Sequence, residues 1–323
     1  MTATISTTMS AKKTIDFVER NNLKAFREIL RDWLAIALII TFSIWANNLF
    51  VYLVSVWLIG IFQFALGESL VHEAVHYNLF IKKSWHYQLQ FIYCFPFLRT
   101  LYSYQKHHLP HHTQLWTDKD YIPKDYEDLG LNKKDKNLFM ILLIKPLLGF
   151  SVIYFLLDAF YDFFQGFNIS IRQKDGSLFK SLLQLCLFWL VVIFCFSLSG
   201  NLDILLLYWF VPLLWCYSFY SLLAEVQQHF NTLSGARTII NPVLNFLFHN
   251  GGYHYVHHLC ATIPWYNLPE AHQAFCSDNP DISKGILDTY KQLGRDNSDI
   301  KLPEIVNGLN ILRAGHLPLR SGN

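Results

Sequence analysis

Eight of the fourteen histidines in this chain gather in three short clusters. Clustered histidines suit metal binding, because a neutral imidazole ligates zinc, copper, iron and nickel. The first cluster has the spacing H-x-x-x-H, and the other two have the spacing H-x-x-H-H. These clusters, called the three boxes below, are His72 and His76; His108, His111 and His112; and His254, His257 and His258.

The spacing within each box predicts that its rings converge. Residues four apart lie on one face of a helix, so His72 and His76 can aim at one point. The i, i+3, i+4 pattern gathers three rings in each of the other boxes. A single box would be more typical of an ordinary surface or core histidine pair, but three boxes indicate a metal site. One zinc ion usually takes four ligands, so eight histidines predict two ions.

The composition is that of a membrane protein. Apolar residues make up 52% of the 323 residues, and charged residues only 15%, against roughly 25% in a typical soluble domain. The net charge of +2 without a dense basic face predicts no nucleic-acid partner. The six cysteines include no C-x-x-C pair, which argues against a disulfide framework, an iron–sulfur cluster or a cysteine-based zinc site. No cleavable signal peptide is expected, because residues 1–32 are polar.

Two long apolar stretches each predict a pair of membrane-spanning helices. Residues 33–67 carry no charge and are interrupted near the middle by Asn47-Asn48. Because about twenty apolar residues span a bilayer, this stretch predicts two helices joined by a tight turn. Residues 178–199 and 204–224 repeat the plan.

Each pair ends in a row of acid and histidine. The second helix continues into Glu68, His72 and His76, and the fourth leads into Glu225 and His229. We therefore expect an all-α integral membrane fold with four transmembrane helices in two hairpins and a cytosolic helical cap that carries the boxes.

The remaining segments fit around this plan. Residues 91–98 are apolar but too short to cross a bilayer, so we place them at the interface or inside the protein. Residues 138–163 are apolar but contain Lys145-Pro146, which favours a helix along the membrane surface over a spanning one. The expected division is a cytosolic segment (1–32), a membrane domain (33–275) and a cytosolic tail (276–323).

The basic residues predict the orientation. Neither tight turn, Asn47-Asn48 nor residues 200–203, contains Lys or Arg. Cytoplasmic loops carry the excess of Lys and Arg in membrane proteins. We therefore expect a multi-pass protein with both termini and all three boxes in the cytoplasm.

The boxes and their flanks resemble those of the membrane fatty-acid desaturases and the related lipid and carotenoid oxygenases. The matching flanks are His76-Tyr-Asn-Leu-Phe80 after the first box, Thr117-Asp-Lys-Asp120 after the second and Ile263-Pro-Trp-Tyr-Asn-Leu-Pro269 after the third. The resemblance covers roughly residues 30–275.

The resemblance implies a non-haem di-iron centre of two iron ions that uses O2 as co-substrate. It also implies a ninth ligand, His229, just after the fourth span; the usual acidic neighbour is replaced here by Gln228. The expected metal ligands are His72, His76, His108, His111, His112, His229, His254, His257 and His258.

Other polar residues near the boxes are candidates for supporting roles. Carboxylates fix the orientation of ligating rings, and the candidates for this task are Glu68, Asp118, Asp120 and Glu225. Asn250 can bind iron directly or through water, although backbone capping is the favoured role. His107 and His249 are expected beside the ligands, whereas His86, His272 and His316 are expected to be ordinary histidines.

The leading hypothesis is an oxidoreductase, an O2-dependent desaturase that introduces a C=C double bond into a lipid acyl chain. The alternative keeps the metal site but inserts oxygen, as a carotenoid or lipid hydroxylase or ketolase, because residues 248–254 also resemble those enzymes. Glu73 and Asn78-Leu-Phe80 favour the acyl-lipid side. A metal transporter or haem protein would place its ligands within the spans, which is not the pattern here.

The expected electron source is external. The chain lacks a His-Pro-Gly-Gly haem motif, a G-x-G-x-x-G loop and an iron–sulfur cysteine pattern. A ferredoxin-like protein or a small cytochrome, with its reductase, is therefore the expected partner, alongside the lipid substrate and the membrane.

Overall fold

The computed structural model describes residues 15–172 and 176–295. This part of the chain is mostly helical, with a single two-stranded parallel pairing. Residues 1–14, most of the expected C-terminal tail and His316 lie outside the described residues.

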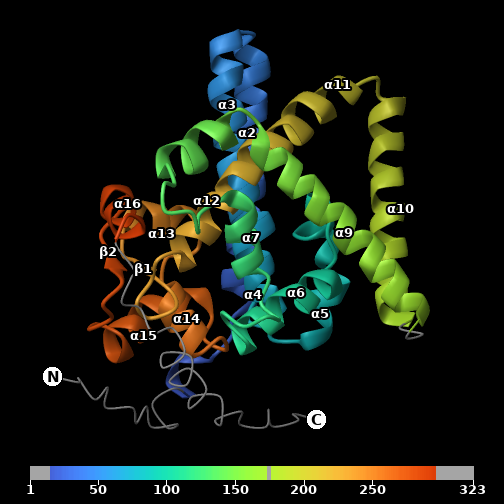
Figure 1. Cartoon of the computed structure of the whole chain (residues 1–323). Coiled ribbons are helices and arrows are strands. Elements are labelled where there is room, and N and C mark those ends of the chain that lie inside the picture. The colour runs from blue at the N-terminus through green and yellow to red at the C-terminus, as the bar shows by residue number, and fades with distance from the viewer. Residues whose placement is uncertain (1–14, 173–175, 296–323) are drawn as a thin grey trace, which may run out of the picture.

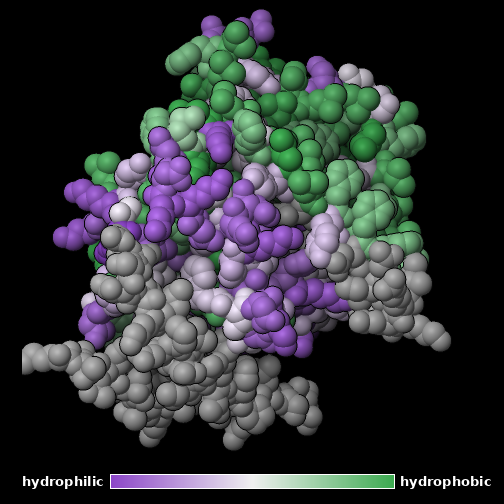
Figure 2. Space-filling model, in the orientation of Figure 1, coloured by the Kyte–Doolittle hydropathy of each residue, from purple (hydrophilic) through white to green (hydrophobic). Residues whose placement is uncertain are grey.

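Four helices in the described part of the chain are long and apolar enough to cross a membrane, as the sequence predicted. In Figure 1, α2 and α3 rise side by side at one end of the molecule, and α10 stands apart from them. The hydrophobic surface in Figure 2 covers this end, whereas hydrophilic residues gather over the other half. The four helices are Asn22–Ala46 (α2), Leu49–Val75 (α3, η2 and α4), Gly176–Leu198 (α10) and Leu202–His229 (α11, η6, η7 and α12).

The first span begins eleven residues earlier than its apolar sequence suggests. The side chain of Asn21 caps α2 by accepting a hydrogen bond from the Lys24 N–H at 3.2 Å. The first turns of α2 therefore carry charged side chains before the apolar part begins.

The tight turn after α2 uses both of its asparagines. Asn47 adopts the left-handed conformation (φ 43°) that asparagine tolerates better than most residues. Asn48 then caps α3, since its side chain accepts hydrogen bonds from the backbone N–H groups of Phe50 and Val51. The turn needs no charged residue.

The second span changes its winding before the first box. Leu49–Phe64 (α3) is followed by a π-helical segment, Ala65–Leu70 (η2), and then by Val71–Val75 (α4). Inside this segment, a Cβ at Gly67 would clash with the ring of Phe97. The glycine lets the chain before the second box lie directly against the span.

Residues 83–129, which include the second box, form short helices that fill the interior. Most of residues 91–98, left between two locations by the sequence, lies inside the protein: Phe91 is exposed, but Tyr93, Cys94, Phe95 and Phe97 are buried. The elements here are Lys83–Gln88 (α5), Gln90–Ile92 (η3), Phe95–Phe97 (η4), Leu101–Thr113 (α6) and Ile122–Leu129 (α7).

The segment expected as one surface helix at 138–163 is instead two helical pieces. Met140–Ile144 (η5) and Lys145–Leu147 (α8) meet Phe150–Arg172 (α9) at a bend of 87°. The bend falls where Gly149 has a φ of +91°, which ends the first piece. This geometry fits a broken span or a re-entrant loop.

The fourth span resembles the second, since π-helical winding interrupts it too. It comprises Leu202–Leu205 (α11), Leu206–Phe210 (η6), Pro212–Tyr217 (η7) and Ser218–His229 (α12). His229 is therefore the last residue of the span.

The chain after the fourth span forms the support of the third box. Strand β1 (Thr238–Ile239) pairs in parallel with β2 (Ile282–Ser283). The other elements are Ile15–Phe17 (η1) near the start, and Pro242–Leu247 (α13), His254–Leu259 (α14), Trp265–Asn267 (η8), Leu268–Phe275 (α15) and Ile286–Leu293 (α16).

Candidate metal centre

The first two boxes lie on neighbouring helices. His72 is on α4, and His76 caps its C-terminal end, where the chain leaves the helix (φ −88°, ψ 5°). The second box lies on α6, whose start is fixed by a capping box between Thr100 and Ser103. Helices α4 and α6 contact each other, so the two boxes face one another.

The third box lies on α14 and is positioned by β1. The N–H of Ile239 donates to the carbonyl of Gly252 at 2.7 Å, just before the box. A Cβ at Gly252 would clash with the Ile239 carbonyl oxygen and the Asn245 side chain. Glycine is required there because the two backbone segments lie so close.

All nine histidines expected as metal ligands come together, in two groups. Within each group, the nitrogens that face one another lie within 4.8 Å. The five-histidine group consists of His72, His76, His108, His112 and His257; the four-histidine group consists of His111, His229, His254 and His258.

The second and third boxes are each divided between the groups, so the simple expectation that the three rings of one box act together is wrong. His108 and His112 belong to the five-histidine group, whereas His111 belongs to the other. Successive residues turn by about 100° around a helix, so positions i and i+4 differ by only about 40°. The residue at position i+3 points about 60° to the other side, so its ring reaches the other group.

The ring nitrogens are spaced as ligands of one ion would be. In the five-histidine group, the Nε2 atom of His108 lies 3.0 Å from that of His76 and 2.9 Å from that of His112. In the four-histidine group, the Nε2 atom of His254 lies 2.8 Å from that of His229 and 3.0 Å from that of His258. Two nitrogens bound at right angles to one ion, each at about 2.1 Å, lie roughly 3 Å apart.

Hydrogen bonds alone do not explain these contacts. An imidazole nitrogen carries either one N–H or one lone pair, so Nε2 of His108 can make a good hydrogen bond to only one of its two neighbours. The same holds for Nε2 of His254. Nε2 of His72 is buried and has no hydrogen-bond partner among the described residues. A metal ion in each group would satisfy all of these atoms, so the residues present fit two ions.

The outward nitrogens of two rings in the four-histidine group are held by the protein. The Nδ1–H of His111 donates to Asp120 at 3.0 Å, and the Nδ1–H of His229 donates to the carbonyl of Gly235 at 2.9 Å. These bonds select the tautomer in which Nε2 presents its lone pair to the centre. Asp120 is 5% exposed and also accepts from the backbone N–H of Trp116 at 2.8 Å.

Burial keeps the rings in the form that binds metal. It lowers the pKa of the imidazoles well below the usual value, and neighbouring histidines lower it further. Neutral imidazole is the form that ligates metals. The rings concerned, outside the spans, are those of His108, His112, His254, His257 and His258.

The other three candidate carboxylates have different surroundings. Glu68 accepts from Arg99 at 2.9 Å, Tyr104 at 2.5 Å and Tyr217 at 2.8 Å. Asp118 is exposed to solvent. Glu225 lies on a cavity wall.

Glu73 has a role that was not predicted from the sequence. Its carboxylate is buried and accepts a hydrogen bond from the Trp265 N–H at 3.0 Å, and so ties the first box to the chain after the third. The signal was its position between His72 and His76 on a helix, where the opposite face must pack inward.

The remaining candidates lie around the centre. Asn250 donates to the Trp265 carbonyl at 3.1 Å and has a φ of 56°, so it shapes the loop. The His107 ring contacts Tyr161. His249 Nε2 lies 2.8 Å from Asp32 on α2 and also contacts Arg31, so it links the first span to the third box instead of touching a ligand.

His86 and His272 belong to neither group. Nε2 of His86 accepts from the Phe80 N–H at 3.0 Å. The His272 ring packs against Tyr253.

A cavity of about 300 Å³ runs from the histidines to the apolar spans. Its inner end is lined by rings of both groups, including His72, His108, His111, His229, His254 and His257. Its outer wall is apolar and includes Ile61, Phe64, Leu244, Leu247, Phe248 and Ile286.

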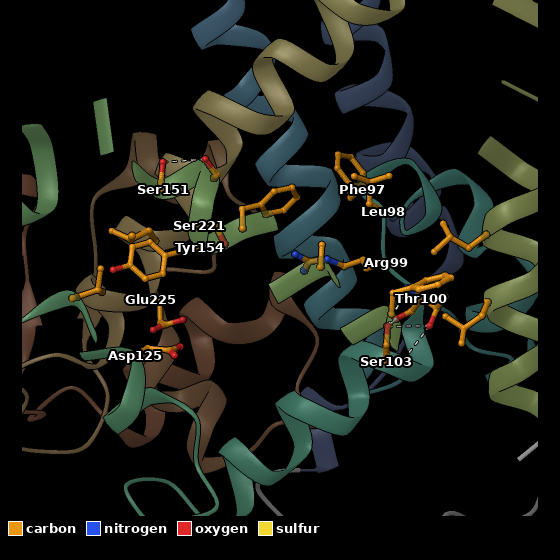
Figure 3. Close-up of a pocket in the computed structure, with 18 residues that line it drawn as sticks. Phe97, Leu98, Arg99, Thr100, Ser103, Asp125, Ser151, Tyr154, Ser221 and Glu225 are labelled. Atoms are coloured by element: carbon orange, nitrogen blue, oxygen red, sulfur yellow. Dashed lines mark hydrogen bonds between the residues drawn. The ribbon is translucent and has the colours of Figure 1, made fainter. Parts of the chain in front are cut away.

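A second cavity of about 140 Å³ lies beside it, between α6, α9, α10 and α12. Figure 3 shows Arg99, Thr100 and Ser103 on one side, with Glu225 and Asp125 on the other. Ser221 and Glu225 line both cavities, so the two spaces adjoin.

A sequence model described as fatty acid desaturase matches residues 47–281. The chain belongs to the fatty acid desaturase family. The resemblance predicted from the boxes is thereby confirmed. A relative of this chain is the dihydrorhizobitoxine desaturase of Bradyrhizobium elkanii, which is 24% identical over 281 residues, covering 82% of this chain and 79% of the relative. Family membership and the four apolar helices together indicate a membrane protein.

Proposed function

We propose that this protein is an integral-membrane, O2-dependent di-iron desaturase that introduces a C=C double bond into the acyl chain of a lipid. The observation that carries the proposal is the pair of histidine groups, seven of whose nine rings are buried, at the end of a cavity with an apolar outer wall. Family membership supports the desaturase activity.

Each group of histidines would hold one iron ion. When bound, the two ions supply the O2-dependent oxidising chemistry that removes two hydrogens from an unactivated hydrocarbon. Asp120 and the carbonyl of Gly235 orient the His111 and His229 rings. The buried surroundings keep bulk water away from the ligands.

The apolar cavity wall would hold the hydrocarbon. Phe64 and Phe248 pack edge to face, with ring centroids 5.1 Å apart, and both line the cavity. Their contact gives one side of the cavity a fixed shape, which restricts which carbon of a chain lies beside the histidines.

The proposal includes a membrane orientation. Helices α2 and α3 form one hairpin, and α10 with α11–α12 forms the other, with both turns on the non-cytoplasmic side and the histidines in a cytosolic cap. A reporter fused at Asn47-Asn48 or at Gly200 should respond as non-cytoplasmic, and one at the C-terminus as cytoplasmic. The opposite labelling would contradict this orientation.

The electrons would come from a separate ferredoxin-like protein or small cytochrome with its reductase. The purified chain supplied only with NAD(P)H and O2 should show no turnover, and adding a donor and its reductase should start it. Turnover without either addition would exclude this part of the proposal.

Lipid analysis tests the reaction itself. Expression of the chain in a lipid-producing host, followed by mass spectrometry of lipids and pigments, should reveal a product two hydrogens lighter than its precursor. The His257→Ala variant, at equal membrane abundance, should give none. A product that has gained oxygen would instead identify a hydroxylase or ketolase with the same metal site.

A further inference from the structure

The chain after the fourth span exposes an apolar surface on two short helices, α13 and α16. On α13, Val243 is 63% exposed and Phe246 is 67% exposed; on α16, Ile286 is 64% exposed and Leu287 is 81% exposed. We call these four side chains the α13–α16 surface. Large apolar side chains grouped in this way mark an interaction site.

This surface adjoins the first span. Arg31 of α2 donates to the carbonyl oxygens of Phe246 at 2.8 Å and Leu247 at 3.1 Å, and its guanidinium lies over the Phe246 ring. One turn further along α2, on the side of Arg31, Leu34 is 51% exposed. The apolar face of the span therefore continues onto α13.

The same helices form the outer wall of the histidine cavity. Leu244 and Leu247 of α13 and Ile286 of α16 line it, and Ile286 is also largely exposed. The lining also includes Ile61 of α3, a residue of the second span. The cavity thus reaches the molecular surface at the α13–α16 surface.

The position of the two helices suits contact with lipid. In Figure 1, α13 and α16 lie nearer than α14 and α15 to the end of the molecule where α2 and α3 project. Arg31 lies at this level, and Arg27 one turn before it has an exposed side chain. Both arginines pair with acidic side chains of α2, Glu28 and Asp32, so a cluster of charged groups marks the level at which the apolar part of the span begins.

We infer that the α13–α16 surface is immersed in the lipid leaflet and forms a lateral entrance, through which the acyl chain of a membrane lipid reaches the histidine cavity. The identity of the entering molecule rests on the proposed function, whereas the contact with lipid does not. The substrate is therefore taken from the bilayer and not delivered from water by a soluble carrier.

Fluorescence quenching tests the contact with lipid without any activity. In the full chain, Cys186, Cys195 and Cys260, which are not fully buried, are replaced by serine. An environment-sensitive dye is then attached to a cysteine introduced by Phe246→Cys or Leu287→Cys, in bilayers of phosphatidylcholine and phosphatidylglycerol. Asp118→Cys, at an exposed polar position, is the matched control.

We expect lipid-borne nitroxide to quench the dye at positions 246 and 287 severalfold more than aqueous iodide does, with the reverse order at position 118. Stronger quenching by iodide at 246 and 287 would overturn the inference. Protection from both quenchers would overturn it too, because a second copy or another part of the chain would then cover the surface.

Kinetics test the entrance. The double substitution Phe246→Asp and Leu287→Asp should raise the KM for a bilayer lipid severalfold and leave kcat unchanged, because the charges oppose immersion while the histidines stay in place. Turnover of a short-chain substrate dispersed in detergent should not change. An unchanged KM for the bilayer lipid would contradict lateral entry. A wild-type chain inactive on every lipid would reject the proposed function and leave the quenching result standing.

Discussion

The two histidine groups differ in how the protein holds them. In the four-histidine group every ring is buried, and two outward nitrogens are fixed by Asp120 and the Gly235 carbonyl. In the five-histidine group His72 and His76 are partly exposed, and Nδ1 of His257 has no hydrogen-bond partner among the described residues. One group has an extra ring, and the other has firmer support.

That support comes from the C-terminal part of the chain. Asp281 accepts from the backbone N–H groups of Leu233 at 2.7 Å and Ser234 at 2.6 Å, so it holds the loop that presents the Gly235 carbonyl to His229. Arg237 is fully buried and donates to Gln292 of α16 at 2.9 Å. Groups that lie behind the ligands orient them. The four-histidine group therefore has fewer rings, but the protein holds those rings more firmly.

The largest expected difference between the groups follows from removing one ring from each. His229→Ala leaves three nitrogens in its group, whereas His257→Ala leaves four in the other. We expect both variants to lose product formation, with iron falling from about two to about one per chain only in His229→Ala. Metal analysis beside membrane abundance measures this, with His272→Ala as the matched control. Equal iron loss in both variants would erase the distinction between the groups.

A smaller effect is expected from the carboxylate behind His111. Asp120→Asn removes the charge but keeps the shape, and should lower metal affinity about 10–100-fold. Competition with a chelator, followed by metal analysis, measures this affinity. Asp118→Asn, two residues away but exposed, should bind metal as the wild type does. If the two variants behave alike, the His111–Asp120 contact has no bearing on the metal.

Weakening the support from the C-terminal segment should have a still smaller effect on metal binding. Asp281→Asn weakens charge-assisted hydrogen bonds to buried N–H groups, which should cost about 1–3 kcal/mol in the free energy of unfolding. Iron content should fall only slightly, and the ion lost should come from the four-histidine group. Thermal unfolding in detergent with metal analysis checks both. A stable variant with full iron would show that the loop holds Gly235 without Asp281.

The smallest effects on metal content should come from substitutions of histidines outside both groups. His86→Ala leaves the Phe80 N–H without its acceptor, so it should lower stability by about 1–3 kcal/mol while keeping both irons. His272 is buried, but its Nδ1 has no hydrogen-bond partner among the described residues, so His272→Ala should keep both irons. Iron loss in His86→Ala at normal abundance would place that residue in the site.

Much of this architecture was predictable from local patterns. Apolar length predicted the four spans, and box spacing predicted that the histidines gather into a metal site, because both depend on periodicity within one helix. The hydrogen bond between Asp120 and His111 could also be anticipated, since Asp120 was one of few acidic residues near a box. These features need no knowledge of how distant segments pack.

The rest depended on packing between distant segments. The division of the second and third boxes between two groups follows from where α4, α6, α12 and α14 meet. Asp281 and Arg237 gave no sequence signal, because their partners lie on other elements. The bend at Gly149 depends on a positive φ that a glycine permits but does not require.

The two-ion centre is the central claim, and elemental analysis tests it most directly. The full-length chain, purified in mild detergent from cells grown with iron and zinc, should contain about two irons per chain and almost no zinc. A single metal per chain, or zinc in place of iron, would contradict the account.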